Sequence, residues 1–320
     1  MSIRILHGDC RDVLRTLADA SVQCCVTSPP YFGLRSYLPP EHCDKSKEIG
    51  NEATPAEYVA ALVDVFREVR RVLHETGVAF LNIGDSYAND DKWGGSTGGK
   101  HVKGLHGNTG VGRQRRHTGF KPKDRMMIPA RVAIALQDDG WWIRDEIVWH
   151  KPRPTPAPVM DRTVCAHEMV YMLTKRAHYF YDWEAVEEPS AYPGLVRKAG
   201  KAFRDLAEAD PNAARKRPGV EREIVVRETR RARSVLSISP SPYSGAHFAT
   251  MPGDLANWCI RAGSRKGDTI LDPFGGAGTT GIAADRIGRD AILIELVAAH
   301  SASQAARLVK DAGMFAEVTP

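Results

Sequence analysis

The chain has 320 residues, of which 42% are hydrophobic and 26% are charged, so it is long enough to bury a full-sized core. Its apolar runs are too short to span a bilayer and it begins without an apolar signal segment, so we expect a cytoplasmic protein without membrane contact. A net charge of +5 does not by itself indicate nucleic acid. The six cysteines contain no CxxC pair, so we expect no metal site and no disulfide framework.

The first half of the chain alternates between strand and helix patterns. Apolar residues at helical spacing predict helices over 12–17, 55–74 and 129–138. Short apolar runs predict strands over 3–6, 22–27, 78–83, 146–149 and 168–174. The helix over 55–74 has the strongest pattern, because Thr54 is a suitable N-cap and Pro55 suits the first turn.

The alternation resumes after Pro252. The same criteria predict helices over 254–262 and 281–287, and strands over 269–271 and 291–295. Repeated βα units predict a mostly parallel sheet with helices on both faces. The expected fold class is therefore α/β and Rossmann-like.

Two basic segments interrupt this pattern. Between Lys92 and Arg125 there are nine Lys or Arg residues against one acid, and 90–120 has so few apolar residues that we expect a mobile loop. The polar stretch 191–241 is likewise basic and is expected to be an inserted lobe or long loop. The expected organisation is one domain in two parts, 1–190 and 242–320, with 191–241 inserted between them.

A glycine-rich turn follows the predicted strand over 269–271. The run from Asp272 to Thr280 reads DPFGGAGTT, a helix follows it, and the next strand ends at Glu295. Glycines let the backbone approach a nucleotide closely, and an acid at the end of the second strand can accept both ribose hydroxyls. A carboxylate before the glycines would repel a pyrophosphate, whereas it suits the cationic amino-acid end of S-adenosylmethionine. The alternative, an ordinary strand-to-helix turn, does not account for the full run together with Glu295.

A second motif, Ser28-Pro29-Pro30-Tyr31, lies directly after the predicted strand over 22–27. The exocyclic amine of cytosine or adenine is a poor nucleophile, because its lone pair is delocalised into the ring. Two acceptors on its N–H groups would localise that lone pair, and the Ser28 side chain and the Pro29 carbonyl are candidates. Pro30 stiffens the turn, and Tyr31 offers a flat face for a base taken out of a duplex. The competing interpretation is a proline turn with a surface tyrosine.

Taken together, these motifs resemble those of the N4-cytosine/N6-adenine DNA methyltransferases of the permuted beta type. In that family the catalytic segment precedes the cofactor segment, and here TSPPY at 27–31 precedes DPFGGAGTT at 272–280. Further segments similar to the family are 119–124, 135–141, 149–152, 166–168, 233–235 and 245–252. The resemblance covers most of the chain except the two basic segments. It implies an S-adenosylmethionine-dependent methyltransferase fold.

The resemblance also implies cofactor-binding residues. The segment 7–10 is similar to the one that contacts the cofactor adenine, with Asp9 accepting from its amino group. Glu295 matches the acid that binds the ribose, and Thr250 lies in the stretch that closes over the methionine end. The full set of candidate cofactor residues is Asp9, Cys10, Thr250, Asp272, Phe274, Gly276, Gly278, Thr279 and Glu295.

Double-stranded DNA is the expected partner, and the basic segments are expected to contact its phosphates. The resemblance is also compatible with a homodimer, with a cognate restriction endonuclease, and with a bacterial or phage-infected host cell. The candidate DNA-binding residues are Arg113, Arg115, Arg116, Lys121, Lys123, Arg230, Arg231 and Arg233. For these charge runs the competing interpretation is a solvated basic face.

Several alternatives remain open on the sequence. Ser28 stands where adenine-specific relatives more often carry Asp, which favours cytosine N4 over adenine N6. An RNA methyltransferase or a catalytically silent DNA-binding module would share part of the pattern. Glutamine-methylating enzymes usually carry NPPY and run in the opposite motif order. Covalent attack by Cys24 or Cys25 is disfavoured, since no adjacent basic group would lower a thiol pKa.

Overall fold

The computed structural model describes residues 1–34, 36–88, 119–154, 156, 159–199, 222–240, 251–311 and 317–319. The chain forms two compact units, described separately below. Unit 1 consists of Met1–Asp182 and Ser234–Pro320, and unit 2 of Trp183–Arg233. Most of the expected mobile loop over 90–120 lies outside the described residues.

A nine-stranded sheet forms the centre of unit 1, with the order β10-β4-β5-β3-β2-β11-β12-β1-β13. All neighbouring strands are parallel except β5, which runs antiparallel to both β3 and β4. The mostly parallel sheet predicted from the sequence is therefore confirmed. Its strands are β1 Ser2–His7, β2 Val22–Thr27, β3 Leu73–Ile83, β4 Trp142–His150, β5 His167–Thr174, β10 Val235–Ser237, β11 Thr269–Asp272, β12 Asp290–Glu295 and β13 Glu317–Thr319.

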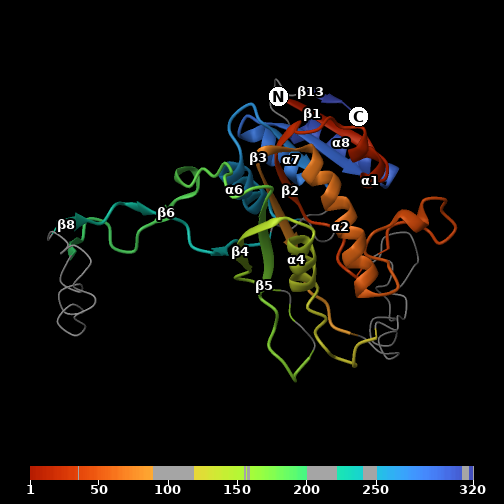
Figure 1. The fold of residues 1–320 in the computed structure, drawn as a ribbon, viewed down its shortest axis with the longest axis horizontal. Coiled ribbons are helices and arrows are strands. Elements are labelled where there is room, and N and C mark those ends of the chain that lie inside the picture. Colours follow the sequence, from red (N-terminus) through yellow and green to blue (C-terminus); the bar gives the residue numbers. More distant parts are fainter. Residues whose placement is uncertain are drawn as a thin grey trace. The chain divides into compact units, whose positions relative to one another are not determined.

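Helices cover both faces of this sheet (Figure 1). One group packs together on one face and comprises α1 Cys10–Arg15, α2 Pro55–Val72 and α4 Ile128–Asp138. The other group comprises α6 Gly253–Gly263, α7 Thr279–Arg286 and α8 Ala298–Asp311. A short 3₁₀ helix, η1 Lys45–Lys47, lies between β2 and α2. In the part of the chain that the structure describes, no helix is both long and apolar enough to cross a membrane.

The helix α2 shows how local sequence sets an element. Thr54 and Glu57 form a reciprocal capping box, in which each side chain accepts from the other residue's backbone N–H, and Pro55 occupies the first turn. The helix ends at Val72, two residues before the predicted end at His74, because Leu73 has an extended backbone and begins β3. Leu73 pairs with Val22 on β2, so strand pairing overrides the helical pattern there.

Other differences from the sequence pattern concern edges of the sheet. The strand predicted over 146–149 extends to nine residues as β4, while β10 and β13 are short edge strands that carry little periodic signal.

Helix α1 begins at Cys10 rather than at residue 12, because the Asp9 side chain caps it by accepting from Arg11 N. No helix is predicted from the sequence over the residues of α8.

Unit 2 contains two small antiparallel sheets. Strand β6 Glu188–Pro189 pairs with β9 Thr229–Arg230, and β7 Val196–Ala199 pairs with β8 Arg222–Val225. A short 3₁₀ helix, η3 Glu184–Val186, precedes β6. The residues after Ser234 return to unit 1, where β10 pairs with β4 in the large sheet.

Candidate active site

The two sequence motifs leave the sheet at the same edge. Strands β2 and β11 are parallel neighbours, with Cys24 paired to Ile270 and Cys25 to Leu271. The segment 28–31 therefore begins beside the segment 272–280 although more than two hundred residues separate them in the chain. Both segments line one cavity of about 410 Å³. This edge is where the chain leaves β2 and β11 towards opposite sides of the sheet, the usual place for ligand binding in open α/β folds.

Asp272 joins the two segments directly. Its Oδ1 accepts from Thr27 Oγ1 at 2.6 Å and from Phe274 N at 3.0 Å, and its Oδ2 accepts from Thr280 Oγ1 at 2.6 Å. Burial raises the pKa of Asp272 to about 6, even though these hydrogen bonds act to lower it. Asp272 borders the cavity as expected, but its carboxylate is first of all the link between the catalytic strand and the glycine turn.

The glycine turn depends on backbone conformations that favour glycine. Gly276 and Gly278 have φ values of +49° and +77°. Gly276 N donates to Glu295 Oε2 at 3.0 Å, so the turn and the acid at the end of β12 form one wall of the cavity. A Cβ on Gly278 would lie 2.9 Å from Gln304 Cγ, which ties the turn to α8. Gly278 itself is not part of the cavity wall formed by described residues, unlike Phe274, Gly276 and Thr279.

Asp9 and Cys10 reach the same cavity from the end of β1. Asp9 caps α1 through Arg11 N at 2.8 Å and forms an ion pair with the Arg11 guanidinium at 2.5 Å. Burial acts to raise the pKa of Asp9, but the hydrogen bonds and charge of Arg11 outweigh it and lower that pKa overall. Burial raises the pKa of Cys10 to about 12, so its thiol is neutral.

Buried residues of α2 and of the segment after β3 contact the Ser28–Tyr31 turn and hold it in place. Tyr58 of α2 donates its hydroxyl to the Pro30 carbonyl at 2.9 Å. The Tyr31 ring lies against the backbone after β3, where a Cβ on Gly84 would come within 2.6 Å of Tyr31 Cε2. Ser86, two residues further along, donates to the Phe32 carbonyl at 3.1 Å. The turn is thus fixed in place by the fold.

A polar network that sequence reasoning missed surrounds the Tyr31 hydroxyl. This hydroxyl donates to Glu168 Oε2 at 2.5 Å, and Ser28 Oγ lies 3.4 Å from Tyr31 Oη. Asn82 Nδ2 donates to the same Glu168 oxygen at 3.3 Å, and the Lys151 ammonium forms an ion pair with the other. Burial, followed by the negative charge of Glu168, raises the pKa of Tyr31 well above its ordinary value. All five residues line the cavity.

The topology explains how Glu168 reaches this edge. Because β5 is antiparallel to β3, its first residues lie where the parallel strands end. Lys151 comes to the same edge from the carboxyl end of β4, where its ammonium also lies 4.5 Å from the Trp149 ring centroid. In the sequence, Lys151 and Glu168 are marked by the similarity of 149–152 and 166–168 to the family, and that similarity does not predict a role for either residue.

Carboxylates outnumber cationic side chains on the cavity wall. Among the described residues, five carboxylates border it, against two lysines and His300; the acids are Asp9, Glu48, Glu168, Asp272 and Glu295. Ion pairs with Arg11, Lys45 and Lys151 offset the charges of Asp9, Glu48 and Glu168, so the surplus of carboxylates gives a modest preference for a ligand that carries positive charge. The two strand thiols offer no competing nucleophile, because burial raises the pKa of Cys24 and of Cys25 well above the ordinary value.

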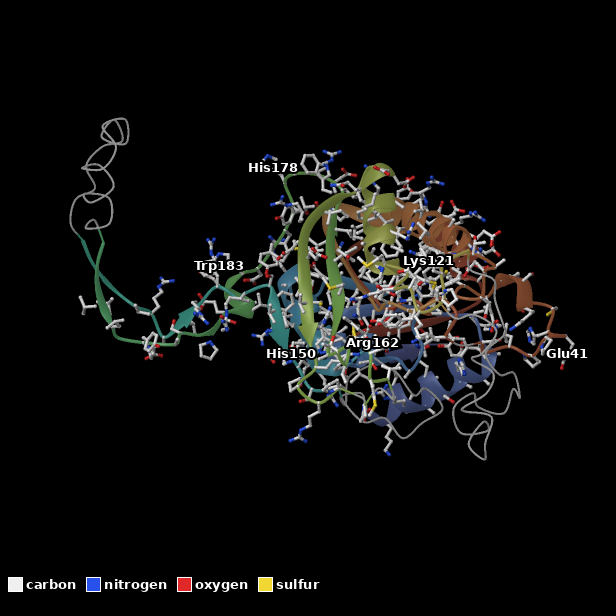
Figure 2. The ribbon with its side chains drawn as sticks, turned by 90° about the horizontal axis from the view of Figure 1, so that it is seen from below. Glu41, Lys121, His150, Arg162, His178 and Trp183 are labelled. Atoms are coloured by element: carbon white, nitrogen blue, oxygen red, sulfur yellow. The ribbon has the colours of Figure 1, made fainter. Side chains whose placement is uncertain are left out.

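The candidate DNA-binding residues are distributed over several segments. Arg113, Arg115 and Arg116, like the cofactor candidate Thr250, lie outside the described residues. Lys121 is exposed on unit 1 (Figure 2), and Lys123 pairs with Asp161 at 2.7 Å. A further cation, Arg162, was not among the candidates; its guanidinium lies 4.0 Å from the Tyr87 ring centroid.

In unit 2 the three arginine candidates already have contacts. Arg230 and Arg233 both form ion pairs with Glu188, at 2.8 and 2.6 Å. Arg231 lies over the ring of Trp183, which Figure 2 labels, at 5.1 Å from its centroid. Glu188 therefore offsets part of the positive charge of this group.

Comparison with known proteins shows the family of the chain. The N6/N4 methyltransferase family model, described as DNA methylase, matches residues 22–305. The type II methyltransferase M.SmaI of Serratia marcescens is 37% identical, covering 92% of this chain and 87% of its own. M.XycI of Xanthomonas campestris pv. cyanopsidis is 38% identical, covering 91% of this chain and 83% of its own.

Solved structures share the fold. A putative DNA modification methylase from Thermus thermophilus, in complex with S-adenosyl-L-methionine, superimposes with a TM-score of 0.58 at 23% identity, covering 99% of this chain and 97% of that one. The cytosine-N4-specific PvuII DNA methyltransferase superimposes with a TM-score of 0.62 at 20% identity, covering 96% and 87%. The extent of the family match and the identity to full-length relatives establish that this chain belongs to the DNA methylase family of N6 and N4 methyltransferases.

Proposed function

We propose that this chain transfers a methyl group from S-adenosylmethionine to the exocyclic amine of a base flipped out of double-stranded DNA, with cytosine N4 favoured. As the N–CH3 bond forms, the S–CH3 bond of the donor breaks, S-adenosylhomocysteine is left, and the methylated amine gives up one proton to solvent. The observation that carries the proposal is the single cavity of about 410 Å³ lined by both Ser28–Tyr31 and the glycine turn. A methyl donor and a base must meet within bond-forming distance, and a shared cavity allows this.

The donor half of the cavity suits S-adenosylmethionine. Glu295 stands at the end of β12, where a carboxylate can accept from ribose hydroxyls, and Gly276 lets the backbone approach the ligand. The acidic wall matches a molecule whose sulfonium and ammonium groups are cationic. When bound, S-adenosylmethionine supplies an electrophilic methyl group. Asp9, Cys10, Phe274 and Thr279 line the remainder of the proposed site.

The base half of the cavity raises the nucleophilicity of the amine. Ser28 Oγ and the Pro29 carbonyl accept from its two N–H groups and so localise the nitrogen lone pair. The acceptors do not need to reorganise, because Tyr58 and Gly84 hold the turn in place before the base arrives. Tyr31 lines this part of the cavity, where its ring can border the base.

Ser28 is the reason for favouring cytosine N4, since relatives that methylate adenine N6 more often carry Asp there. Adenine N6 is the alternative.

For DNA contacts we propose Lys121 and Lys123 in unit 1, Arg230, Arg231 and Arg233 in unit 2, and Arg113, Arg115 and Arg116 in the segment between β3 and α4. We further propose that 191–241 serves target recognition. The relatives are type II methyltransferases, so we also propose a partner endonuclease of the same specificity.

The test is a methylation assay followed by mass spectrometry of nucleosides. The purified protein is incubated with isotope-labelled S-adenosylmethionine and with duplex DNA, single-stranded DNA or RNA. Labelled N4-methylcytosine from duplex DNA is expected. N6-methyladenine would support the alternative base, and label confined to RNA would overturn the proposal, as would donor binding without transfer to any DNA. The Ser28→Ala variant, whose kcat is expected to be strongly reduced, serves as the low-activity control.

A further inference from the structure

The network around Glu168 addresses a difficulty in the proposed function, on which this inference rests. A serine hydroxyl carries one hydrogen and two lone pairs. To accept from the amine, Ser28 must point its hydrogen away from the base. A hydroxyl that is free to rotate would instead spend part of its time donating into the pocket, which does not help the amine.

The contacts of Tyr31 set a direction for these hydrogens. The Tyr31 hydroxyl has one hydrogen and two candidate acceptors, Glu168 Oε2 at 2.5 Å and Asn82 Oδ1 at 3.4 Å. The shorter contact to a carboxylate is the stronger hydrogen bond. Tyr31 therefore donates to Glu168, which leaves its oxygen as the acceptor for the Ser28 hydrogen at 3.4 Å.

Glu168 is suited to end such a chain, because an ionised carboxylate can only accept. Lys151 supplies the counter-charge on Oε1, and Asn82 Nδ2 donates to Oε2 from the neighbouring strand. Its side chain is 15% exposed, which limits screening of the charge by solvent. Hydrogen bonds arranged in series polarise one another, so the charge also strengthens Ser28 as an acceptor.

We propose that Glu168 is a positioning residue for methyl transfer: through Tyr31 it turns the Ser28 hydroxyl into an acceptor and gives the neutral serine part of the effect of a carboxylate at that place. Glu168 acts through two hydroxyls and does not itself accept a proton from the base in this account. Its effect therefore depends on Tyr31.

The experiment is a double-mutant cycle on the full chain with Glu168→Gln, Tyr31→Phe and the double variant. Glutamine keeps the shape but not the charge, and phenylalanine keeps the ring but not the hydroxyl. At saturating duplex DNA and S-adenosylmethionine, each single variant is expected to lower kcat by about 10- to 100-fold, the range for a hydrogen bond to a charged group. The double variant should lose no more than the worse single variant, and KM for the donor should stay unchanged.

A matched tyrosine–glutamate pair provides the control. Tyr171 on β5 has its Oη 3.4 Å from Oε1 of Glu146 on the neighbouring strand β4, and Glu146 is not one of the described residues that line the cavity. Glu146→Gln should retain the wild-type kcat. Thermal unfolding of each variant shows whether it is folded; if Glu168→Gln unfolds the protein, Tyr31→Phe carries the test, and an unchanged kcat for it overturns the proposal.

The outcomes separate this inference from the proposed function. Losses that multiply in the double variant mean that Glu168 acts independently of Tyr31, and they overturn the inference while methyl transfer by the wild type stands. A parallel rise in the donor KM points to a structural effect and overturns it too. A wild-type protein that transfers no methyl group to DNA overturns the proposed function and the inference with it.

Discussion

The two halves of the cavity are built in different ways. The donor half is built mainly on one βαβ unit, which carries Asp272, the glycines and Glu295 close together in the chain, and Asp9 and Cys10 join it from the end of β1. The base half is assembled from residues at the ends of β2, β3, β4 and β5. Glu168 lies on β5, which runs antiparallel to both of its neighbours, β3 and β4. A contiguous motif can be found in a sequence, whereas a site assembled from four strands depends on the topology.

The largest expected effect separates chemistry from donor binding. Ser28→Ala should lower kcat by about 10²- to 10³-fold, comparable to the loss of one preorganised hydrogen-bonding group in other active sites. The dissociation constant for S-adenosylmethionine, measured by calorimetry, should stay within about twofold of wild type, because Ser28 belongs to the base half. A weakened donor affinity would mean that the two halves are not independent.

The next prediction concerns the support of the base half. Gly84→Ala places a methyl group 2.6 Å from the Tyr31 ring, so the ring must move. Since small misplacements of reacting groups are costly, kcat should fall by up to about 100-fold. Gly253→Ala is the matched control, because its added Cβ has no described atom within 4 Å apart from its chain neighbours and the backbone of its own helix. Equal kcat values for the two variants would contradict the importance of this contact.

The converse variant in the donor half should change binding and leave the chemistry intact. Glu295→Gln removes the charge from the side chain that accepts from Gly276 N and Val297 N. Donor affinity should fall by about 10- to 100-fold, while kcat at saturating donor stays within a few-fold of wild type. Initial rates over a range of donor concentrations separate the two quantities, and a loss confined to kcat would place Glu295 in the chemistry instead.

The last prediction concerns stability and pH and has no direct effect on either half of the reaction. The folded-state pKa of Asp272 is raised to about 6, above its ordinary value of 3.8, so the folded state holds this proton more tightly than the unfolded state. Its contribution to the free energy of unfolding is therefore full below about pH 4 and lost as pH rises through about 6, on the order of 2–3 kcal/mol.

Asp272→Asn removes this titration. The difference in unfolding free energy between the wild type and this variant, measured with urea at about pH 4.5 and about pH 7, should move in favour of the variant as pH rises. A difference that is constant with pH would mean that Asp272 has the same pKa folded and unfolded.

The same contrast explains what the sequence could predict. The glycine run and the proline turn each have a local pattern, and parallel βα units place their carboxyl ends at one edge, so the shared cavity could be expected. The position of Glu168 could not be expected, because it depends on β5 running antiparallel to its neighbours. An apolar run in the sequence predicts a strand but not the direction in which that strand runs. Leu73 shows the same limit on a smaller scale, since it fits the stripe of α2 but pairs with β2.

The expected role of Asp272 also needed the structure. From the sequence its charge suggests a contact with the donor, which stays a prediction, and the fold adds that its oxygens accept from Thr27, Phe274 and Thr280. Hydrogen bonds between segments remote in the chain leave no trace in the spacing of residues.

The most direct test of the account is a crystal structure of the chain with S-adenosylmethionine, for which no target sequence is needed. The account predicts that the donor occupies the cavity with its ribose at Glu295 and its methyl group directed towards Ser28. A donor bound elsewhere, or one whose methyl group faces away from the Pro-Pro turn, would contradict it.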